Sequence, residues 1–446
     1  MISRKIERRL EEFFQANGRY ALLVDGARQV GKTFIIEAFG RTHYESVVKI
    51  DFVKMKGAIA LFQDVADESE ILTRISAFVD VPLIPGKTLI FLDEIQKCPE
   101  AVTYIKYLVR DDGRFHYILS GSLLGVELKN IRSVPVGTLD EVKMYPLDFE
   151  EFVLATGGNR ELIAAARVGW EERKPVAKVL HDRLMRFFRF YLVVGGMPSV
   201  VQRYVETKDI RQVIEEQRKI LVEYRKDISQ YDEDNALRIR LVYDRLAPEL
   251  NKKNKRFYAG SVGEDGRFDR LEDEFVWLKE AGVALPSYHV TEPKIPLVLA
   301  QKPNFFKLFA NDVGLLAAMY MDGIQVRILN GETEINFGAV YENAVAQELV
   351  AHGFSPTTYN SKAHGEVDFI VERDAKVLPI EVKCGKSYAR HRALNHVLDD
   401  PEYSIEEAIV FDRDALKTDG KIFYAPIYMT MFLQKDVLPA QMIYEI

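Results

Sequence analysis

The sequence predicts an α/β protein with more than one domain, in which helices cover both faces of a parallel sheet and a second α/β domain follows. At 446 residues the chain is too long for a single compact core. Short continuous apolar runs, such as 21–24 and 88–92, are typical of strands buried on both faces of a parallel sheet. We therefore expect four segments: 1–160, 161–235, 236–320 and 321–446.

Composition limits the partners and the compartment. The net charge of −7 argues against a protein that coats nucleic acid through its overall field, although a local basic face is still compatible with it. The two cysteines, Cys98 and Cys384, make neither a disulfide framework nor a zinc site with paired spacing, which fits a reducing cytosol. The first 14 residues have helical spacing without a secretory apolar core, and no apolar run reaches the ~18 residues that cross a bilayer. We expect a soluble, cytoplasmic protein without a membrane partner.

The first chemical motif follows the apolar run 21–24. Its glycines let several backbone N–H groups point at one anion, its lysine reaches the β- and γ-phosphates, and its hydroxyl can ligate Mg²⁺. The alternative is a glycine-rich turn with a solvated lysine, but the position between a strand and a helix favours a phosphate loop. The predicted nucleotide-binding residues are Gly26, Ala27, Arg28, Gln29, Val30, Gly31, Lys32, Thr33 and Phe34.

A second motif supports the first. The run 88–92 ends in Asp93 and Glu94. We expect Asp93 to hold Mg²⁺ together with Thr33, and Glu94 to orient and deprotonate the attacking water. Two acids after an apolar strand are moderately specific alone and strong when paired with a phosphate loop.

The next apolar run, 116–119, ends in Ser120, whose hydroxyl is placed to sense a γ-phosphate or simply to form a turn. Both interpretations stay open. Arg110, Arg114 and Arg132 are candidates for an arginine finger, and none is preferred over a surface charge.

These motifs, together with further segments, resemble the prokaryotic AAA-type ATPases whose phosphate loop reads G-x-R-Q-x-G-K-T and whose C-terminal half is a domain of unknown function. The resemblance implies ATP as ligand, Mg²⁺ as cofactor, and binding and hydrolysis carried by Lys32, Thr33, Asp93 and Glu94. Where many relatives have Gly-Arg, this chain has Gly137-Thr138, which puts a finger from that segment in doubt. The segments that carry the likeness are 26–33, 89–96, 120–122, 135–152 and 195–198.

The middle of the chain predicts a helical lid or connector over 161–235 and a winged helix over 236–320. The basic residues of the connector form either a nucleic-acid surface or solvated helix faces paired with glutamates. In the winged helix, acids at 272–274 would repel a duplex, so a protein-interaction spacer is as well supported as a DNA reader. The candidate phosphate contacts are Lys252, Lys253, Lys255, Arg256, Arg267 and Arg270.

In the last segment a helix at 341–349 precedes two predicted strands, 366–371 and 377–383. Alternation puts their charges on one face, where Asp368 and Glu381 could chelate a metal, Lys383 orient water and Glu342 approach from the helix. This resembles the PD-(D/E)xK, restriction-endonuclease-like core, which implies Mg²⁺-dependent cutting of phosphodiesters. An inactive nuclease-like scaffold and an unrelated α/β tail are the alternatives.

Together these predictions describe an ATP-binding protein and ATPase that controls a nuclease-like, DNA-processing domain. The alternative is a nucleotide-dependent switch that binds a protein partner through an inactive nuclease-like domain. A third class, a ring-forming motor, requires oligomerisation and an arginine finger in trans.

Overall fold

The computed structural model describes residues 2–122, 137–231, 235–252, 255–258, 271–321, 323–332, 338–361, 363, 365–384 and 391–435. The chain divides into two compact units. The first comprises Met1–Pro146 and Val276–Val283, and the second comprises Leu147–Phe275 and Ala284–Ile446.

The first unit contains a five-stranded sheet in the order β2-β3-β4-β1-β5, with every neighbouring pair parallel. The apolar runs of the sequence form its central strands, which are buried along their whole length, as expected for a sheet covered on both faces. The strands are β1 (Ala21–Asp25), β2 (Ser46–Asp51), β3 (Thr88–Asp93), β4 (His116–Gly121) and β5 (Leu139–Lys143).

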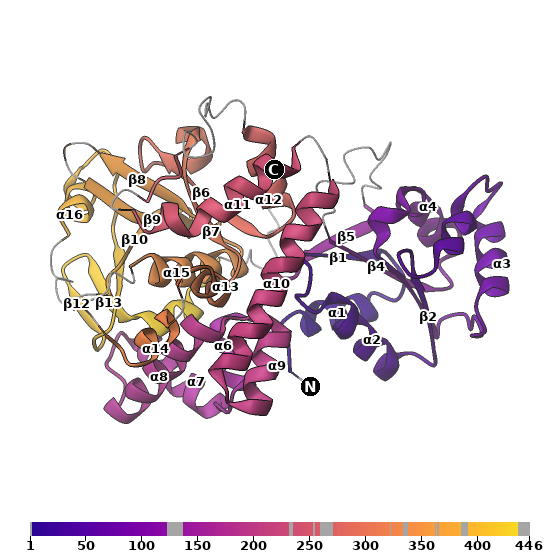
Figure 1. Cartoon of the computed structure of the whole chain (residues 1–446), viewed down its shortest axis with the longest axis horizontal. Helices are drawn as coiled ribbons and strands as arrows, with labels where there is room; N and C mark the ends of the chain where they lie inside the picture. The colour runs from indigo at the N-terminus through magenta and orange to yellow at the C-terminus, as the bar shows by residue number, and fades with distance from the viewer. Residues whose placement is uncertain are drawn as a thin grey trace, which may run out of the picture. The chain divides into compact units, whose positions relative to one another are not determined.

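Helices cover both faces of this sheet. Alternate residues of β1 point to opposite sides, so that Leu22 joins the core under α1 and α2 while Leu23 joins the core under α3 and α4 (Figure 1). These helices are α1 (Glu7–Gln15), α2 (Lys32–His43), α3 (Glu68–Phe78) and α4 (Pro99–Tyr107). The predicted α/β class, a parallel sheet with helices on both faces, is confirmed.

The second unit begins with helices. The expected helical connector corresponds to α7 to α10, and the structure adds α6 before it and α11 after it. The helices are α6 (Phe149–Ala155), α7 (Arg160–Glu172), α8 (Lys178–Val194), α9 (Pro198–Thr207), α10 (Ile210–Tyr231), α11 (Ala236–Leu250), α13 (Val313–Met319), α14 (Ile324–Leu329), α15 (Gly338–Ala351) and α16 (Arg392–Asp399). Helix α12 (Glu272–Glu280) begins in the second unit, and its residues from Val276 onward belong to the first. Among the described residues no single helix is long and apolar enough to span a bilayer; α8 and α9 meet that test only as a pair bent by 119°.

A mixed eight-stranded sheet completes the second unit, in the order β12-β13-β11-β10-β9-β8-β6-β7. Within the segment predicted as a winged helix, β6 and β7 form an antiparallel pair, and β6 pairs in parallel with β8 of the C-terminal segment. One sheet therefore joins residues on both sides of the boundary predicted near residue 320. The strands are β6 (Ala284–Val290), β7 (Gln301–Ala310), β8 (Thr357–Ser361), β9 (Gly365–Arg373), β10 (Lys376–Val382), β11 (Ala408–Asp412), β12 (Lys417–Asp419) and β13 (Ile422–Pro426).

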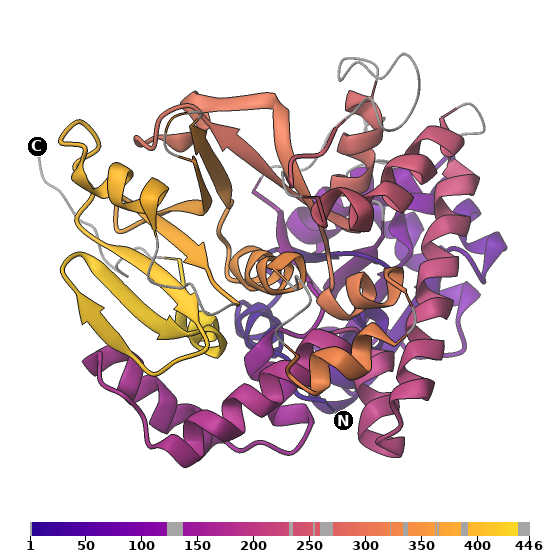
Figure 2. The same ribbon diagram turned by 60° about the vertical axis from the view of Figure 1, so that its left-hand side comes forward.

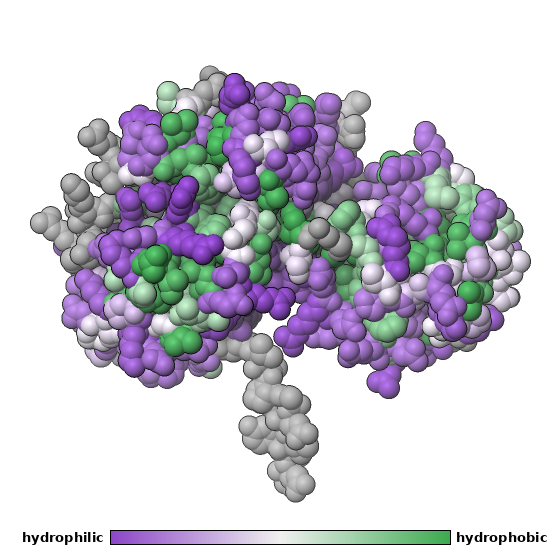
Figure 3. All heavy atoms as spheres, turned by 90° about the horizontal axis from the view of Figure 1, so that it is seen from below, coloured by the Kyte–Doolittle hydropathy of each residue, from purple (hydrophilic) through white to green (hydrophobic). Residues whose placement is uncertain are grey.

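Helix α15 lies against this sheet. Figure 2 shows the strands, coloured from salmon to yellow, curving around the orange helix. Residues Ala339–Leu349 are all buried, so the helix has no solvated face, and its polar side chains have partners inside the unit. The outer surface is mixed: in Figure 3 apolar patches are interrupted by polar side chains.

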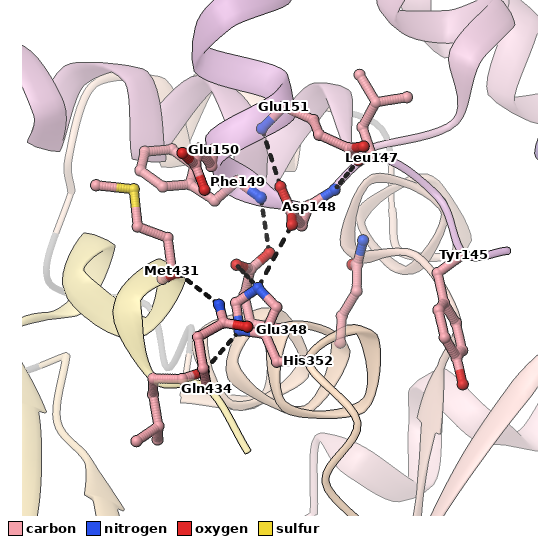
Figure 4. Close-up of polar contacts among 12 residues, drawn as sticks. Tyr145, Leu147, Asp148, Phe149, Glu150, Glu151, Glu348, His352, Met431 and Gln434 are labelled. Atoms are coloured by element: carbon pink, nitrogen blue, oxygen red, sulfur yellow. Dashed lines mark hydrogen bonds and ion pairs between the residues drawn. The ribbon is translucent and has the colours of Figure 1, made fainter. Parts of the chain in front are cut away.

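The second unit starts at a buried polar junction (Figure 4). The Leu147 N–H donates to the Gly196 carbonyl at 2.7 Å, and the Leu147 carbonyl accepts from the Tyr191 hydroxyl at 2.9 Å. Glu348 of α15 accepts from the Phe149 N–H at 2.8 Å and from the same tyrosine at 3.0 Å. These bonds satisfy backbone groups that would otherwise be buried without partners.

Asp148 caps α6 at the same junction. Its carboxylate accepts from the Glu151 N–H at 2.9 Å while the Glu151 side chain accepts from the Asp148 N–H at 3.1 Å, which is a reciprocal capping box. The second carboxylate oxygen of Asp148 lies 3.4 Å from His352 Nε2, whose other ring nitrogen contacts the Leu433 carbonyl at 2.8 Å. The start of α6 and helix α15 are therefore held together by polar contacts as well as by packing.

Gly196 has no room for a side chain, because a Cβ atom built there would lie 2.0 Å from the Leu147 carbonyl oxygen. We expect Gly196→Ala to lower the free energy of unfolding by about 2 to 3 kcal/mol, the usual cost of overpacking a tight site. Urea unfolding measures this. Gly57→Ala is the control, since its nearest neighbour lies at 3.7 Å, in ordinary contact. Equal losses of unfolding free energy in the two variants would contradict the conclusion that Gly196 has no room for a side chain.

Asp312 ties α13 to the same junction, accepting from the Gly196 N–H at 2.6 Å and from the Leu315 N–H at 2.9 Å. Burial raises the pKa of this carboxyl from 3.8 to about 6, although backbone N–H donors lower it. Since the folded state then binds the proton more tightly than the unfolded state, stability falls as pH rises from about 4 to about 6.

We expect this carboxyl to remove up to about 3 kcal/mol of stability across that window, at ~1.4 kcal/mol per unit of pKa difference. The Asp312→Asn variant cannot release the proton, so its unfolding free energy should lack this part of the slope. Urea unfolding of both proteins from pH 4.5 to 7.5 makes the comparison. Parallel pH profiles would show that Asp312 titrates normally.

Candidate nucleotide site and C-terminal ion cluster

The predicted phosphate loop connects β1 to α2. Gly26, Gln29 and Gly31 have φ angles of 150°, 66° and 96°, which bend the loop as an anion-binding concavity requires. At Gly26 a Cβ atom would lie 2.2 Å from the Met144 carbonyl oxygen, so this position needs glycine for space as well as for conformation. The loop ends at the N-terminus of α2, where unpaired N–H groups favour a phosphate.

Lys32 is folded onto this loop. Its ammonium donates to the Gly26 carbonyl at 2.7 Å and to the Ala27 carbonyl at 2.9 Å, and the side chain is buried. Burial lowers the pKa of Lys32 to about 8, while the Glu94 and Asp25 carboxylates raise it. An incoming phosphate can replace the two carbonyl groups as the acceptor and favours the charged form.

The Asp93 carboxylate is where the predicted site residues meet. The Thr33 hydroxyl donates to its Oδ2 at 3.0 Å, and the Ser120 hydroxyl donates to its Oδ1 at 2.5 Å. These groups come from α2, β3 and β4, whose ends lie at the same edge of the parallel sheet. The structure therefore brings together three residues that lie far apart in the sequence.

One further charge at this carboxylate, Lys49, was not predicted. The Lys49 ammonium of β2 lies 3.3 Å from Asp93 Oδ2 and 2.7 Å from Glu37 Oε1 of α2. Lys49 is one charged residue among the valines and isoleucine of β2, at a half-buried position, and such a placement requires a partner. That pattern was the available signal, but it does not say which carboxylate is contacted.

Glu94 follows Asp93 in an unusual conformation. Its φ of 56° is left-handed, a conformation that a residue with a side chain rarely adopts and that is concentrated at functional sites. The Gln96 amide donates to Glu94 Oε2 at 2.6 Å, and the Ser122 hydroxyl lies 3.5 Å from the same oxygen. Gln96 thus orients the predicted base, a contact that the sequence motif did not reveal.

The other predicted loop residues differ in exposure. Ala27 and Val30 are buried in the core, Arg28 Nε lies 3.4 Å from Ser122 Oγ, and Phe34 is 58% exposed on α2. Arg4, which was not predicted, donates to the Val30 carbonyl at 3.0 Å and to the Tyr145 carbonyl at 2.7 Å. It therefore links the loop to the segment that follows β5.

The donors at Asp93 fit the predicted cofactor. Thr33 and Asp93 offer a hydroxyl and a carboxylate within 3.0 Å of each other, and Mg²⁺ prefers such oxygen ligands beside phosphate oxygens. Among the finger candidates, Arg110 and Arg114 are exposed and Arg132 lies outside the described residues. No finger is assigned.

A second cluster of charges lies in the C-terminal sheet. Asp368 of β9 accepts from the Val382 N–H of β10 at 2.8 Å, and the Lys383 ammonium lies 3.1 Å from Glu381 Oε1. Glu342 of α15 is buried in the same region. The predicted residues of this segment therefore do gather beside the ends of β9 and β10.

Two lysines from outside the predicted motif complete this cluster. The Lys307 ammonium of β7 lies 3.3 Å from Glu342 Oε2 and 3.8 Å from Asp368 Oδ1, and it also pairs with Glu366. Lys255 pairs with the other oxygen of Glu342. Of the remaining basic candidates of the winged helix, Lys253, Arg267 and Arg270 lie outside the described residues.

Burial and ion pairing shift the pKa values of these groups in opposite directions. Burial lowers the pKa of Lys307, but the Glu342 and Glu366 carboxylates outweigh it and raise that pKa above its ordinary value. Burial raises the pKa of Asp368, yet Lys307 and Lys255 hold it below the usual range. Burial and the Asp368 carboxylate raise the pKa of Glu381 well above its ordinary value. Asp368, the acid whose pKa is lowered, contacts Lys307.

This arrangement does not fit the metal site expected from Glu342, Asp368 and Glu381. In the part of the chain that the structure describes, no three acidic, histidine or cysteine side chains are grouped to hold one metal ion. Lys307 could have been noticed in the sequence, since it stands between Phe305-Phe306 and Leu308-Phe309 in an otherwise apolar strand. A lysine in such a place requires buried acids, but the sequence does not show which ones.

Three family models match parts of the chain. Residues 18–153 match an AAA domain, residues 185–326 match a domain of unknown function (DUF8612), and residues 337–428 match a second domain of unknown function (DUF4143). The first match contains the phosphate loop, Asp93 and Ser120. The match to an AAA domain therefore falls on the part of the chain where the sequence resemblance placed it. The nuclease-like resemblance stays a prediction.

Solved structures that the comparison matches to this chain include a Walker-type ATPase of Pyrococcus abyssi, at 15% identity and a TM-score of 0.44; the match covers 72% of this chain and 96% of that one. The Orc1 protein of Aeropyrum pernix in complex with DNA has 13% identity and a TM-score of 0.30; the match covers 73% of this chain and 95% of that one. The RuvB Holliday junction branch migration motor of Thermotoga maritima has 12% identity and a TM-score of 0.29; the match covers 66% of this chain and 91% of that one. A comparison with curated proteins finds no match.

The short bond from Ser120 to Asp93 predicts a kinetic effect. We expect Ser120→Ala to lower kcat for ATP about 10- to 100-fold and to change KM less than about 3-fold, because the hydroxyl holds a carboxylate that acts in hydrolysis. Steady-state phosphate release measures both constants. Ser122→Ala is the matched control, since its contact with Glu94 is long, at 3.5 Å. Loss of nucleotide binding in Ser120→Ala with unchanged kcat would contradict the prediction.

Proposed function

We propose that the chain is a Mg²⁺-dependent ATPase whose nucleotide state controls its second unit. The observation that carries the proposal is the convergence of Thr33 and Ser120 on the Asp93 carboxylate, beside a phosphate loop that holds Lys32. In P-loop ATPases these residue types hold the metal–triphosphate and position water. The choice of ATP rests on the family resemblance.

Each residue has a distinct task in this proposal. The loop N–H groups and Lys32 hold the β- and γ-phosphates, and Thr33 and Asp93 hold Mg²⁺, which neutralises charge on the transferred phosphoryl group when bound. Glu94, oriented by Gln96, accepts the proton of the attacking water. Ser120 keeps Asp93 in place at the end of its strand.

Control of the second unit is proposed from the chain connection. Met144 donates its N–H to the Asp25 carbonyl at 2.7 Å, beside the phosphate loop, and three residues later Leu147 bonds to Gly196 inside the second unit. A change in loop conformation on hydrolysis would act on this short segment, because nucleotides shift equilibria through contacts that differ between states. Arg4, which binds both Val30 and Tyr145, supports the same path.

The partner of the second unit is either DNA or a protein. Exposed basic side chains of α11, such as Arg238 and Arg240, are partly paired with Glu274 and Asp244, which weakens the case for a DNA-binding face. The buried lysines of the C-terminal cluster likewise favour partner binding over phosphodiester cleavage. We therefore favour a nucleotide-dependent switch, with a nuclease as the second candidate.

Phosphate release from ATP tests the catalytic proposal. We expect Lys32→Ala to weaken ATP binding at least about 10-fold, because its ammonium contacts the phosphates. Glu94→Gln should keep ATP binding and lower turnover about 100-fold, because general-base catalysis is lost. Glu100→Gln, an exposed acid of α4, is the control and should behave as wild type. Full turnover by Glu94→Gln would disprove the assigned base.

Labelled single- and double-stranded DNA, incubated with Mg²⁺ or Mn²⁺ and ATP, separates the two candidates. Cutting that disappears in Lys383→Ala while ATP turnover persists would establish the nuclease. DNA binding that weakens steeply with salt, without cutting, would make DNA the partner of the switch.

A further inference from the structure

Lys307 occupies the centre of the C-terminal acidic cluster. Only 2% of its side chain is exposed, and its ammonium faces carboxylates from α15 and β9, namely Glu342, Glu366 and Asp368. It projects from β7, whose neighbouring Phe306 and Leu308 are buried. The packing of β7 therefore fixes the position of the Lys307 side chain.

The carboxylate oxygens of this cluster already face an ammonium group, which disfavours a divalent cation at the same place. A nuclease-like core needs Glu342, Asp368 and Glu381 to direct oxygens at one ion, but Glu342 and Asp368 already direct oxygens at the Lys307 ammonium. A divalent ion bound to Asp368 would lie close to this ammonium in a buried site, where like charges repel more strongly than in water. An ammonium and a metal thus compete for the same carboxylates.

We propose that the Lys307 ammonium takes the place of a divalent metal ion in this cluster, so that the C-terminal module is a metal-independent scaffold that cannot cut phosphodiesters. This inference goes beyond the proposed ATPase function and does not rest on it.

The charges of the cluster support this assignment. Lys255, Lys307 and Lys383 face four carboxyl groups, namely those of Glu342, Glu366, Asp368 and Glu381. Each of these acids therefore already has an ammonium partner without any metal, as buried charges require. Lys255 and Lys307 come from the segment before residue 320, so the same contacts fasten this segment to the C-terminal strands.

Mn²⁺ binding to the nucleotide-free full-length chain, measured by electron paramagnetic resonance, tests the proposal. Four proteins are compared: wild type, Asp368→Asn, Lys307→Met, and Lys307→Met/Asp368→Asn. Methionine keeps the length of the lysine stem and removes its charge. Wild type is compared with Asp368→Asn, and Lys307→Met with Lys307→Met/Asp368→Asn. Each difference counts only the Mn²⁺ bound at this cluster, because Mn²⁺ bound at the phosphate loop is the same in both members of a pair.

We expect wild type and Asp368→Asn to bind the same amount of Mn²⁺. Lys307→Met should bind one more ion than its double variant, with at least about tenfold higher affinity, because Glu366 and Asp368 lose their ammonium partner and Glu342 keeps only Lys255. Mn²⁺ should then raise the Tm of Lys307→Met and leave that of wild type unchanged.

Two results would overturn the proposal. One is an additional Mn²⁺ ion in wild type that disappears in Asp368→Asn, which would show that metal binds despite Lys307. The other is a folded Lys307→Met protein that binds no more Mn²⁺ than its double variant. If Lys307→Met does not fold, as judged by circular dichroism, the comparison of wild type with Asp368→Asn still decides whether the native cluster holds a metal.

Discussion

The carboxylate of Asp93 is the point on which the first unit depends. It receives hydroxyl groups from α2 and β4 and an ammonium from β2, so that three neighbouring strands and one helix are fixed relative to one carboxylate. This is possible because parallel strands end at the same edge of a sheet and deliver their next residues to one place. The phosphate loop adds Lys32 at that edge, and the AAA-domain match spans the same residues.

The second unit is governed by a different constraint, the pairing of buried charge. Helix α15 is buried from Ala339 to Leu349, yet it carries Glu342, Asn343, Gln347 and Glu348. Asn343 and Gln347 bind backbone groups near β7 and α13, and Glu348 binds the backbone at the start of α6. The helix therefore fixes segments from the beginning, middle and end of the unit at the same time. Glu342 extends this arrangement to Lys255 and Lys307.

These two constraints bear on the proposed function in different ways. Nucleotide chemistry is confined to a sheet edge where conformation is set by a few short hydrogen bonds, and such bonds can differ between ATP and ADP states. The second unit is held by many buried polar contacts and by a cluster whose acids already contact ammonium groups. It is better suited to respond as one body than to perform metal-dependent chemistry of its own.

The sequence by itself determined the parallel sheet, the phosphate loop and the positions of Asp93 and Ser120, because continuous apolar runs and glycine spacing report local conformation directly. It also indicated that Glu342, Asp368, Glu381 and Lys383 gather, because strand alternation places charges on one face. The sequence did not reveal that Lys49 contacts Asp93, that Arg4 binds the loop, or that Lys307 lies among the acids. Those partners are separated by 26 to 61 positions. Only tertiary structure decides such contacts, since the side chain that neutralises a buried charge is selected by strand order and packing, which no local pattern encodes.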